Sequence, residues 1–193
     1  MERPFENLRD EGVELRRWRA GDLDELLRVV TESLDHLAPW MPWAASGYDR
    51  RNALGFLAQA KAKWESGEAF SYAILSDAGA IIGSCGMMAR IGPGGFEIGY
   101  WLHPGHTGRG VATRAARALA LEAFRIGADR VEIVHDVANS ASGSVPRRLG
   151  FTEVARRPPQ EPLTSAEAGL DVVWRLRQPS SAGTSRSATE LMQ

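Results

Sequence analysis

The spacing of apolar residues predicts a strand followed by a helix near the start of the chain. Residues 12–18 alternate between apolar and polar side chains, with Val13 and Leu15 on one face, as in a strand that is buried on one side. A helix is expected to begin at Asp22, because Glu25 three residues later completes a pattern similar to a capping box. The apolar stripe of this helix consists of Leu23, Leu26, Leu27 and Val30.

A segment rich in tryptophan and proline separates this helix from the next one. Two prolines within residues 37–43 argue against a regular helix, so we expect a loop that carries aromatic side chains. Asp49 is the expected N-cap of a second helix, which runs to about Trp64.

After Gly67 the apolar period changes to that of strands. Residues 70–76 and 80–90 are typical of a hairpin with a turn at 77–79, and a further strand is expected at 96–102. The remaining expected elements are a helix at 110–126 with Gly127 as its C-cap, a strand at 130–137, a short helix between 139 and 149, and strands at 151–157 and 170–177. Pro146 predicts that the short helix is irregular or kinked, because proline removes a helical hydrogen bond beyond the first turn.

This order of elements predicts a mixed α/β fold with helices that cover a largely antiparallel sheet. We expect one domain at residues 12–177, preceded by an N-terminal extension at residues 1–11. From residue 178 the composition shifts to Ser, Thr, Ala and Gly without an apolar period. Residues 178–193 are therefore expected to form a disordered tail.

Composition and charge say more about the expected partners than about the fold. The 193 residues include 23 Lys and Arg against 24 Asp and Glu, a formal net charge of −1. This balance removes the general electrostatic case for nucleic acid or an anionic membrane as a partner. No apolar stretch approaches the ~18 residues of a spanning helix, and the charged N-terminus lacks the apolar core of a signal peptide. We therefore expect a soluble cytoplasmic protein with no nucleic-acid and no membrane partner.

The cysteine and histidine residues give no sign of metal or thiol chemistry. A single Cys85 excludes an internal disulfide, and nothing beside it in the sequence would lower its pKa, so we expect it to be packed. No pair of histidines has the helical i, i+4 spacing with a carboxylate that a zinc site uses, so no metal is expected.

The most informative stretch joins the strand at 96–102 to the helix at 110–126 through a glycine-rich turn. Gly108 and Gly110 allow the backbone to approach a ligand closely, and Arg109 between them can add a positive charge. The first amides of the helix lack internal partners and sit at its positive end, a geometry that suits a pyrophosphate. On this evidence alone, a plain strand–helix turn is an equally good interpretation. Neither the spacing of a dinucleotide-binding turn nor the Gly-Lys-Ser/Thr of a P-loop is present.

Four segments together resemble the GNAT N-acetyltransferase superfamily. Thr107-Gly-Arg-Gly-Val-Ala112 is similar to that family's acetyl-CoA signature, Gln/Arg-x-x-Gly-x-Gly/Ala, with Thr107 in place of the usual Gln or Arg. Glu97-Ile-Gly-Tyr-Trp-Leu102 resembles the strand that holds pantetheine, and Asn139-Ser-Ala-Ser-Gly-Ser-Val-Pro-Arg-Arg-Leu-Gly-Phe151 resembles the family's Asn-x-x-Ser…Leu-Gly-Phe segment. Glu32-Ser-Leu-Asp-His-Leu-Ala-Pro-Trp-Met-Pro-Trp43 resembles the RimJ/RimL branch, which acetylates N-terminal amines of ribosomal proteins. The resemblance covers roughly residues 12–177.

This resemblance implies a GNAT-like fold and acetyl-CoA as co-substrate. It assigns the pyrophosphate to the backbone of residues 108–112 and the pantetheine to the end of the strand at 96–102, which splays from the strand at 130–137. It also implies that Asn139 and Ser142 face the pantetheine and the sulfur. The implied cofactor-binding residues are Trp101, Leu102, Thr107, Gly108, Arg109, Gly110, Val111, Ala112, Thr113, Asn139 and Ser142.

The implied reaction is attack of a neutral amine on the acetyl thioester. An α-amino group, with a pKa of about 7.7–8.0, loses its proton near neutral pH more readily than a lysine near 10.4, so a modest base or a water relay is enough. Glu97 is the first candidate base, because alternation places it opposite Phe96 and Ile98, and Glu132 on the neighbouring strand is the second. The alternative for Glu97 is a surface glutamate on a strand.

Many members of the family use a tyrosine to protonate the leaving thiolate, but the matching position here is Pro146. Ser142 is the expected substitute as a hydrogen-bond donor to the sulfur, although a serine at this place also serves as a helix cap. Trp40 and Trp43 are expected to line the acceptor site, or else to cap the core.

The resulting interpretation is an acetyl-CoA-dependent N-acetyltransferase. A protein or peptide N-terminus is the expected acceptor, and a small-molecule amine such as an antibiotic or polyamine is the alternative. A protein that binds acyl-CoA as a sensor without turnover is a third interpretation. The sequence leaves the oligomeric state open, with a homodimer as one option.

Overall fold

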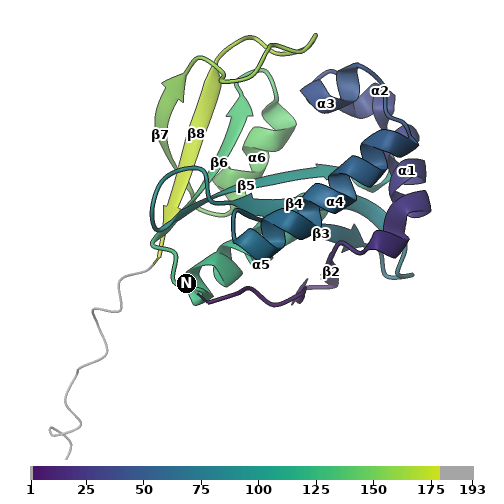
Figure 1. Cartoon of the computed structure of the whole chain (residues 1–193). Coiled ribbons are helices and arrows are strands. Elements are labelled where there is room, and N and C mark those ends of the chain that lie inside the picture. The colour runs from purple at the N-terminus through teal and green to yellow at the C-terminus, as the bar shows by residue number, and fades with distance from the viewer. Residues whose placement is uncertain (1, 179–193) are drawn as a thin grey trace, which may run out of the picture.

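The computed structural model describes residues 2–178 and places its strands in one eight-stranded sheet (Figure 1). The strand order is β1-β2-β3-β4-β5-β6-β8-β7, and every neighbouring pair is antiparallel except β5 and β6. The expected mixed α/β fold with a largely antiparallel sheet is thus confirmed. The strands are β1 (Asn7–Asp10), β2 (Val13–Arg17), β3 (Ala69–Leu75), β4 (Ile81–Met88), β5 (Gly95–Leu102), β6 (Arg130–Asp136), β7 (Thr152–Arg157) and β8 (Asp171–Arg177). The helices are α1 (Leu23–Thr31), α2 (Leu34–Leu37), α3 (Pro42–Ala45), α4 (Arg50–Ser66), α5 (Val111–Arg125) and α6 (Ser140–Arg148), with 3₁₀ turns η1 (Ala20–Asp22) and η2 (Pro104–His106).

Helices cover both faces of the sheet. The alanine-rich side of α5 packs in the larger core cluster together with Ile98 of β5 and Ile133 of β6. Leu26 of α1 and Leu57 of α4 belong to a second cluster, on the opposite face, where α4 runs across the sheet (Figure 1). Alternate residues of each strand therefore contact different layers.

The segment expected to be an N-terminal extension contains strand β1. Asp10 and Val13 face each other across a two-residue turn in which Glu11 and Gly12 both have positive φ, 43° and 83°. Two positive φ values define the tight turn that matches the twist of a hairpin. Arg117 of α5 donates to Asp10 at 2.7 Å and ties this hairpin to the helix layer.

The expected capping box at Asp22 is wrong. The Asp22 carboxylate accepts from the Arg19 amide at 2.8 Å and from the Arg16 guanidinium, whereas Glu25 accepts from the Ile81 amide of β4 at 2.6 Å. Both carboxylates thus bind partners outside α1. A local sequence pattern cannot show such competition, because the partners come from other elements.

The tryptophan and proline segment was expected to form a loop, but it lies between and partly within two short helices, α2 and α3. Pro42 occupies the first position of α3, where its missing N–H has no partner to lose. The expected N-cap at Asp49 is confirmed, since its side chain accepts from the Asn52 amide at 2.9 Å.

The later elements follow the expected order, with small shifts at their ends. Helix α5 has Ile126 as its C-cap, and Gly127 follows with a φ of 98° instead of forming the cap itself. Pro146 lies inside α6, beyond its first turn, and is buried. Apart from Gln178, the expected tail at 178–193 lies outside the described residues. None of the described helices combines the length and apolar character needed to cross a membrane.

Candidate active site

Strands β5 and β6 separate along their length and open the middle of the sheet. Their pairing ends at Glu97 and Glu132, whereas β5 stays paired with β4 as far as Leu102. The His103 amide donates to Ile82 O of β4 at 2.8 Å. Because backbone groups alternate sides along a strand, the Leu102 backbone faces the open side of β5. The splay that the family resemblance implied is confirmed.

A glycine-rich turn follows β5 and leads into α5. Gly108 and Gly110 both have left-handed φ, 72° and 73°, and Gly110 is the N-cap of α5. Within residues 2–178, no group accepts a hydrogen bond from the amides of residues 108–113. These donors lie at the positive end of α5, so the turn fits an anion such as a pyrophosphate.

Side chains around this turn are arranged to leave its backbone accessible. Thr107, which replaces the usual Gln or Arg, donates its hydroxyl to Pro104 O at 2.9 Å and so stabilises the turn. Arg109 is exposed, and Arg114 donates to Arg109 O at 3.1 Å, which places a guanidinium beside Gly110. Two positive charges therefore lie near the free amides.

A cavity of about 920 Å³ passes between the separated strands. It is lined from the α5 side by Tyr100 and Ser142 and from the α4 side by Glu97 and Trp101. Of the residues selected from the sequence, the structure brings Glu97, Trp101, Asn139, Ser142, Trp40 and Trp43 to this cavity. Leu102 and residues 107–113 do not line it and instead form the adjoining strand end and turn.

Ser142 lies in the first turn of α6 and has two defined neighbours. Its amide donates to the Asn139 side chain at 3.0 Å, so Asn139 caps the helix. The Tyr100 hydroxyl of β5 lies 3.1 Å from Ser142 O and 3.3 Å from Ser142 Oγ. Sequence analysis missed Tyr100, although its alternation with Ile98 and Leu102 places it on the α5 side.

The two candidate bases differ in their access to the cavity. Glu97 lines it and forms an ion pair with Arg90, a partner that follows β4. This contact raises the pKa of the Arg90 guanidinium, which therefore stays charged. Glu132 is also buried, but it is paired with Arg175 at 2.5 Å and does not line the cavity. The geometry favours Glu97 over Glu132.

Asp136 fixes one wall of the cavity. Its carboxylate accepts from four backbone amides: Ala138 at 2.8 Å, Ala168 and Gly169 at 2.9 Å, and Leu170 at 3.1 Å. Burial raises the pKa of Asp136, but these four hydrogen bonds outweigh that effect and lower it below its usual value. The connection between β7 and β8, which contributes Glu161 and Glu167 to the cavity, is thereby anchored to the end of β6.

His135 lines the cavity as a neutral imidazole. The Trp174 indole donates to its Nε2 at 3.0 Å, so Nδ1 carries the proton and donates to Asp136 O at 2.7 Å. Burial lowers the pKa of His135, in agreement with this arrangement. With both ring nitrogens engaged, His135 is poorly suited to take a proton from a substrate.

An aromatic wall closes the α4 side of the cavity. The Trp43 ring lies 6.0 Å from that of Trp101 and 5.7 Å from that of Tyr48, measured between centroids, and Trp40 lines the same cavity. The Trp101 carbonyl points toward β4, since a Cβ added to Gly83 would lie 2.3 Å from it. Trp101 thus contributes its side chain to the wall while its carbonyl faces β4.

Cys85 also lines the cavity but is unsuited to act as a nucleophile. Its side chain is buried, and this burial raises the pKa of its thiol. The described residues contain no group of three His, Cys, Asp or Glu that could hold a metal ion.

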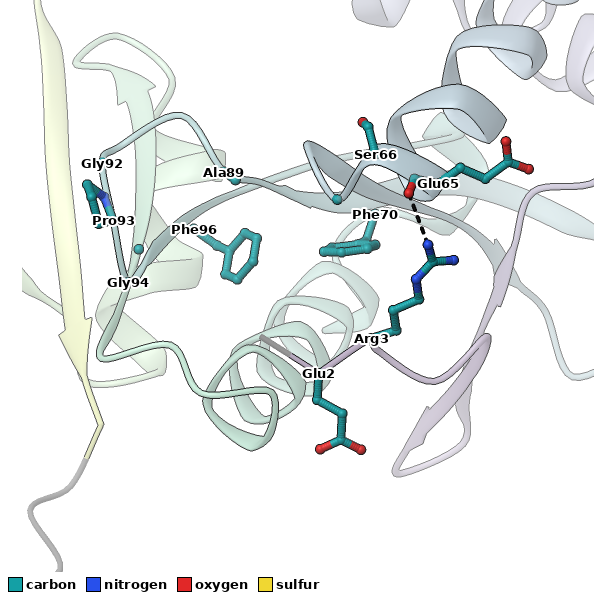
Figure 2. Close-up of a pocket in the computed structure, with 12 residues that line it drawn as sticks. Glu2, Arg3, Glu65, Ser66, Phe70, Ala89, Gly92, Pro93, Gly94 and Phe96 are labelled. Carbon is teal, nitrogen blue, oxygen red and sulfur yellow. Dashed lines mark hydrogen bonds between the residues drawn. The ribbon is translucent and has the colours of Figure 1, made fainter.

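A second cavity, of about 590 Å³, lies at the other end of β5 (Figure 2). Phe70 and Phe96 lie side by side between the turn at 92–94 and Arg3, and Arg3 donates to Glu65 O at 3.0 Å at one edge. None of the residues selected from the sequence lines this cavity, so it is separate from the candidate active site.

Comparison with known proteins places the chain in a family. Residues 13–152 match the acetyltransferase (GNAT) domain, and the chain belongs to that family of acyltransferases, whose co-substrate is acetyl-CoA. A 58-residue stretch is 43% identical to the putative ribosomal N-acetyltransferase YdaF of Bacillus subtilis; it covers 30% of this chain and 32% of that protein. The chain thus matches about a third of the length of that relative.

Solved structures share the fold over most of the chain. The microcin C7 self-immunity acetyltransferase MccE, in complex with acetyl-CoA and AMP, has a TM-score of 0.79 at 19% identity, covering 88% of this chain and 94% of that one. RimL, a ribosomal L7/L12 α-N-protein acetyltransferase in complex with coenzyme A, has a TM-score of 0.79 at 22% identity, covering 86% and 94%. The expected likeness to RimJ/RimL-type proteins is confirmed.

Proposed function

We propose that this protein transfers the acetyl group of acetyl-CoA to the α-amino group of a protein or peptide. The observation that carries the proposal is the cavity where β5 and β6 separate, which reaches Tyr100 and Ser142 on the α5 side of the sheet and Glu97 on the other side. The turn with the free amides follows the same strand, β5. A donor bound along this path would present its thioester to an acceptor that enters from the opposite face.

The chain offers a complete set of groups for binding the donor. The amides of residues 108–113, with Arg109 and Arg114 beside them, would hold the pyrophosphate. The open edge of β5 near Leu102 would pair with the pantetheine as an added strand would. Asn139 would then face the pantetheine from the start of α6, and Ser142 would face the sulfur.

The chemistry divides between the two faces of the sheet. Glu97, directly or through water, would take a proton from the acceptor ammonium, and the neutral nitrogen would then form a bond to the acetyl carbon. The second proton, which the nitrogen loses as the amide forms, would pass to water on the same side. The C–S bond breaks with its electron pair on sulfur, where the Ser142 hydroxyl would stabilise the thiolate by donating a hydrogen bond. An α-amino group, with a pKa of about 7.7–8.0, loses its proton near neutral pH more readily than a lysine near 10.4, so a site with a single carboxylate suits an α-amino acceptor better.

The relatives support an N-terminal acceptor. The curated relative is named a ribosomal N-acetyltransferase, and RimL is described as an α-N-protein acetyltransferase. A small-molecule amine is the second candidate, because the aromatic wall of Trp40, Trp43 and Trp101 could enclose a small acceptor. MccE, a structural neighbour, is an immunity factor against microcin C7.

An acceptor panel tests these alternatives. Acetyl-CoA is supplied with peptides that have a free N-terminus, with N-terminally blocked peptides that contain lysine, and with polyamines, while CoA release and acetylated product are both measured. We expect product only from the free N-terminal peptides. Product from a polyamine alone would establish the small-molecule alternative, and calorimetric acetyl-CoA binding without any product would establish the sensor.

A further inference from the structure

A tyrosine from β5 contacts the serine that would face the sulfur. Tyr100 is the third residue of β5 beyond the last pair with β6, and its side chain packs against the larger core cluster. Its hydroxyl lies 3.1 Å from Ser142 O and 3.3 Å from Ser142 Oγ. Tyr100 and Ser142 both line the cavity.

The two acceptors on Ser142 compete for the single phenolic proton. If Tyr100 donates to Ser142 O, the Ser142 hydroxyl can donate to the Tyr100 oxygen. The serine proton then points away from the cavity. If Tyr100 donates to Ser142 Oγ, the serine proton must find another acceptor. A thiolate in the cavity would favour the second arrangement. An anion that accepts a hydrogen bond from the serine hydroxyl makes Ser142 Oγ a better hydrogen-bond acceptor for Tyr100.

We propose that Tyr100 is a positioning residue: by donating to Ser142 Oγ, it directs the Ser142 hydroxyl proton at the leaving sulfur. The inference rests on the proposed acetyl transfer and adds to it a second hydrogen bond in series. No proton is transferred along these two hydrogen bonds, since the sulfur keeps the electron pair of the broken C–S bond and both protons lost by the ammonium leave at the Glu97 side.

The surroundings of Tyr100 keep its hydroxyl in the donor form. Burial raises the pKa of Tyr100 to about 12, although the hydrogen bond to Ser142 opposes this shift. The titratable groups nearby do not compete: Cys85, its partner in register on β4, is a buried thiol with a raised pKa, and His135 of β6 is neutral. A thiol titrates near 8.5, so transfer of the phenolic proton to the thiolate is unfavourable and hydrogen bonding is the remaining means of stabilisation.

The test measures the pKa of the thiol of bound CoA and needs no acceptor. The thiolate absorbance of the enzyme–CoA complex is followed with pH in the wild-type protein, Tyr100→Phe, Ser142→Ala and the double variant, with CoA-free enzyme subtracted. Tyr72→Phe is the matched control, because the Tyr72 hydroxyl donates to Phe5 O at 2.8 Å in the core and does not line the cavity. Thermal unfolding of each variant separates loss of structure from loss of this interaction.

We expect Tyr100→Phe to raise the pKa of the bound thiol by about 0.5–1, the size of one hydrogen bond. Ser142→Ala should raise it at least as much, the double variant should equal Ser142→Ala, and Tyr72→Phe should match the wild type. In turnover with the acceptor identified by the panel, Tyr100→Phe should lower kcat about three- to ten-fold without raising the KM for acetyl-CoA.

The proposal would be overturned if the thiol of bound CoA had the same pKa in Tyr100→Phe as in the wild type. It would also be overturned if the pKa shift of the double variant equalled the sum of the shifts of the two single variants. Either result leaves the acceptor panel unaffected. Conversely, failure of the panel with every amine would refute the proposed function while the thiol titration still reported on Tyr100.

Discussion

Glu97 of β5 and Glu132 of β6 are buried glutamates that face each other in register, and each is paired with an arginine. They differ in that only Glu97 lines the cavity. Glu97→Gln is expected to lower turnover by about 10²-fold with near-normal affinity for acetyl-CoA, because the amide cannot accept a proton from the acceptor.

Glu132→Gln is the matched control for that variant, since it also removes a buried carboxylate from an arginine on the same face of the sheet. Steady-state kinetics of both variants across pH 6–9, with calorimetric acetyl-CoA binding, separate the two residues. Equal losses of turnover in both variants would mean that the effect is structural and that Glu97 is not the base.

Gly110 permits a second test at the level of a single residue. Gly110→Glu should abolish acetyl-CoA binding, with an affinity loss of at least about 10²-fold, because a carboxylate would enter a site built from free amides and arginines. The backbone there is left-handed, with a φ of 73°, so the substitution also introduces strain.

Gly127→Glu controls for this strain, since Gly127 also has a positive φ of 98° and lies at the opposite end of α5 with open space around it. Calorimetric titration of acetyl-CoA into both variants, with melting temperatures, is the measurement. Unchanged affinity in Gly110→Glu would remove the turn from the donor site.

At the scale of elements, one side chain anchors the connection between β7 and β8 to the end of β6. Each carboxylate oxygen of Asp136 accepts hydrogen bonds from two backbone amides. In Asp136→Asn the side-chain NH₂ would face two N–H donors, so we expect a loss of about 2–4 kcal/mol in the free energy of unfolding. A higher KM for the acceptor should accompany it, because this connection lines the cavity.

The lowered pKa of Asp136 gives this prediction a pH dependence. A carboxylate with a lower pKa in the folded state stabilises the fold above its unfolded value of about 3.9 and loses that contribution as the pH falls through the folded value. The difference in stability between the wild type and Asp136→Asn, measured by denaturant unfolding, should therefore be full at pH 6–7 and shrink below about pH 4. Asp129→Asn is the control: this carboxylate is exposed before β6, so the substitution should change the free energy of unfolding little at any pH. A stability difference between the wild type and Asp136→Asn that stays constant down to pH 3 would contradict the argument.

Sequence periodicity predicted the elements whose apolar residues repeat within one strand or helix, such as α4, α5 and the meander of β3, β4 and β5. It missed β1, because the turn that forms the hairpin places Glu11, a residue other than glycine, at positive φ. It missed α2 and α3, because two prolines argue against a regular helix although Pro42 begins one.

The candidate site was predictable only where one segment carries the information. The glycine turn and Ser142 lie within motifs that are continuous in sequence. Tyr100, Arg90 and Asp136 act through partners on other elements, at separations of up to 42 residues, and no local pattern signals such contacts.

For the molecule as a whole, the splay of β5 and β6 gives the two faces of the sheet different groups at the cavity. The free amides before α5, the open edge of β5 and Ser142 are reached from the α5 and α6 side. Glu97 and the aromatic wall of Trp40, Trp43 and Trp101 lie on the side of α3 and α4. In the proposed function, a donor and an acceptor therefore approach from opposite faces of the sheet and meet in the gap, which keeps their binding sites apart.

This separation predicts that the aromatic wall affects the acceptor alone. Trp43 is 41% exposed and contacts Trp101 and Tyr48 at one edge of the cavity. Trp43→Ala should raise the KM for the acceptor about ten-fold through loss of aromatic contact area, while the KM for acetyl-CoA stays unchanged.

Leu54→Ala is the matched control for Trp43→Ala, because Leu54 is 51% exposed on nearby α4 and does not line the cavity. Initial rates measured with each substrate varied in turn give the two KM values for both variants. If Trp43→Ala weakened acetyl-CoA as much as the acceptor, donor and acceptor would share one face of the sheet. The proposed separation of donor and acceptor sites would be equally refuted if Trp43→Ala and Leu54→Ala had the same acceptor kinetics, because the aromatic wall would then make no contact with the acceptor.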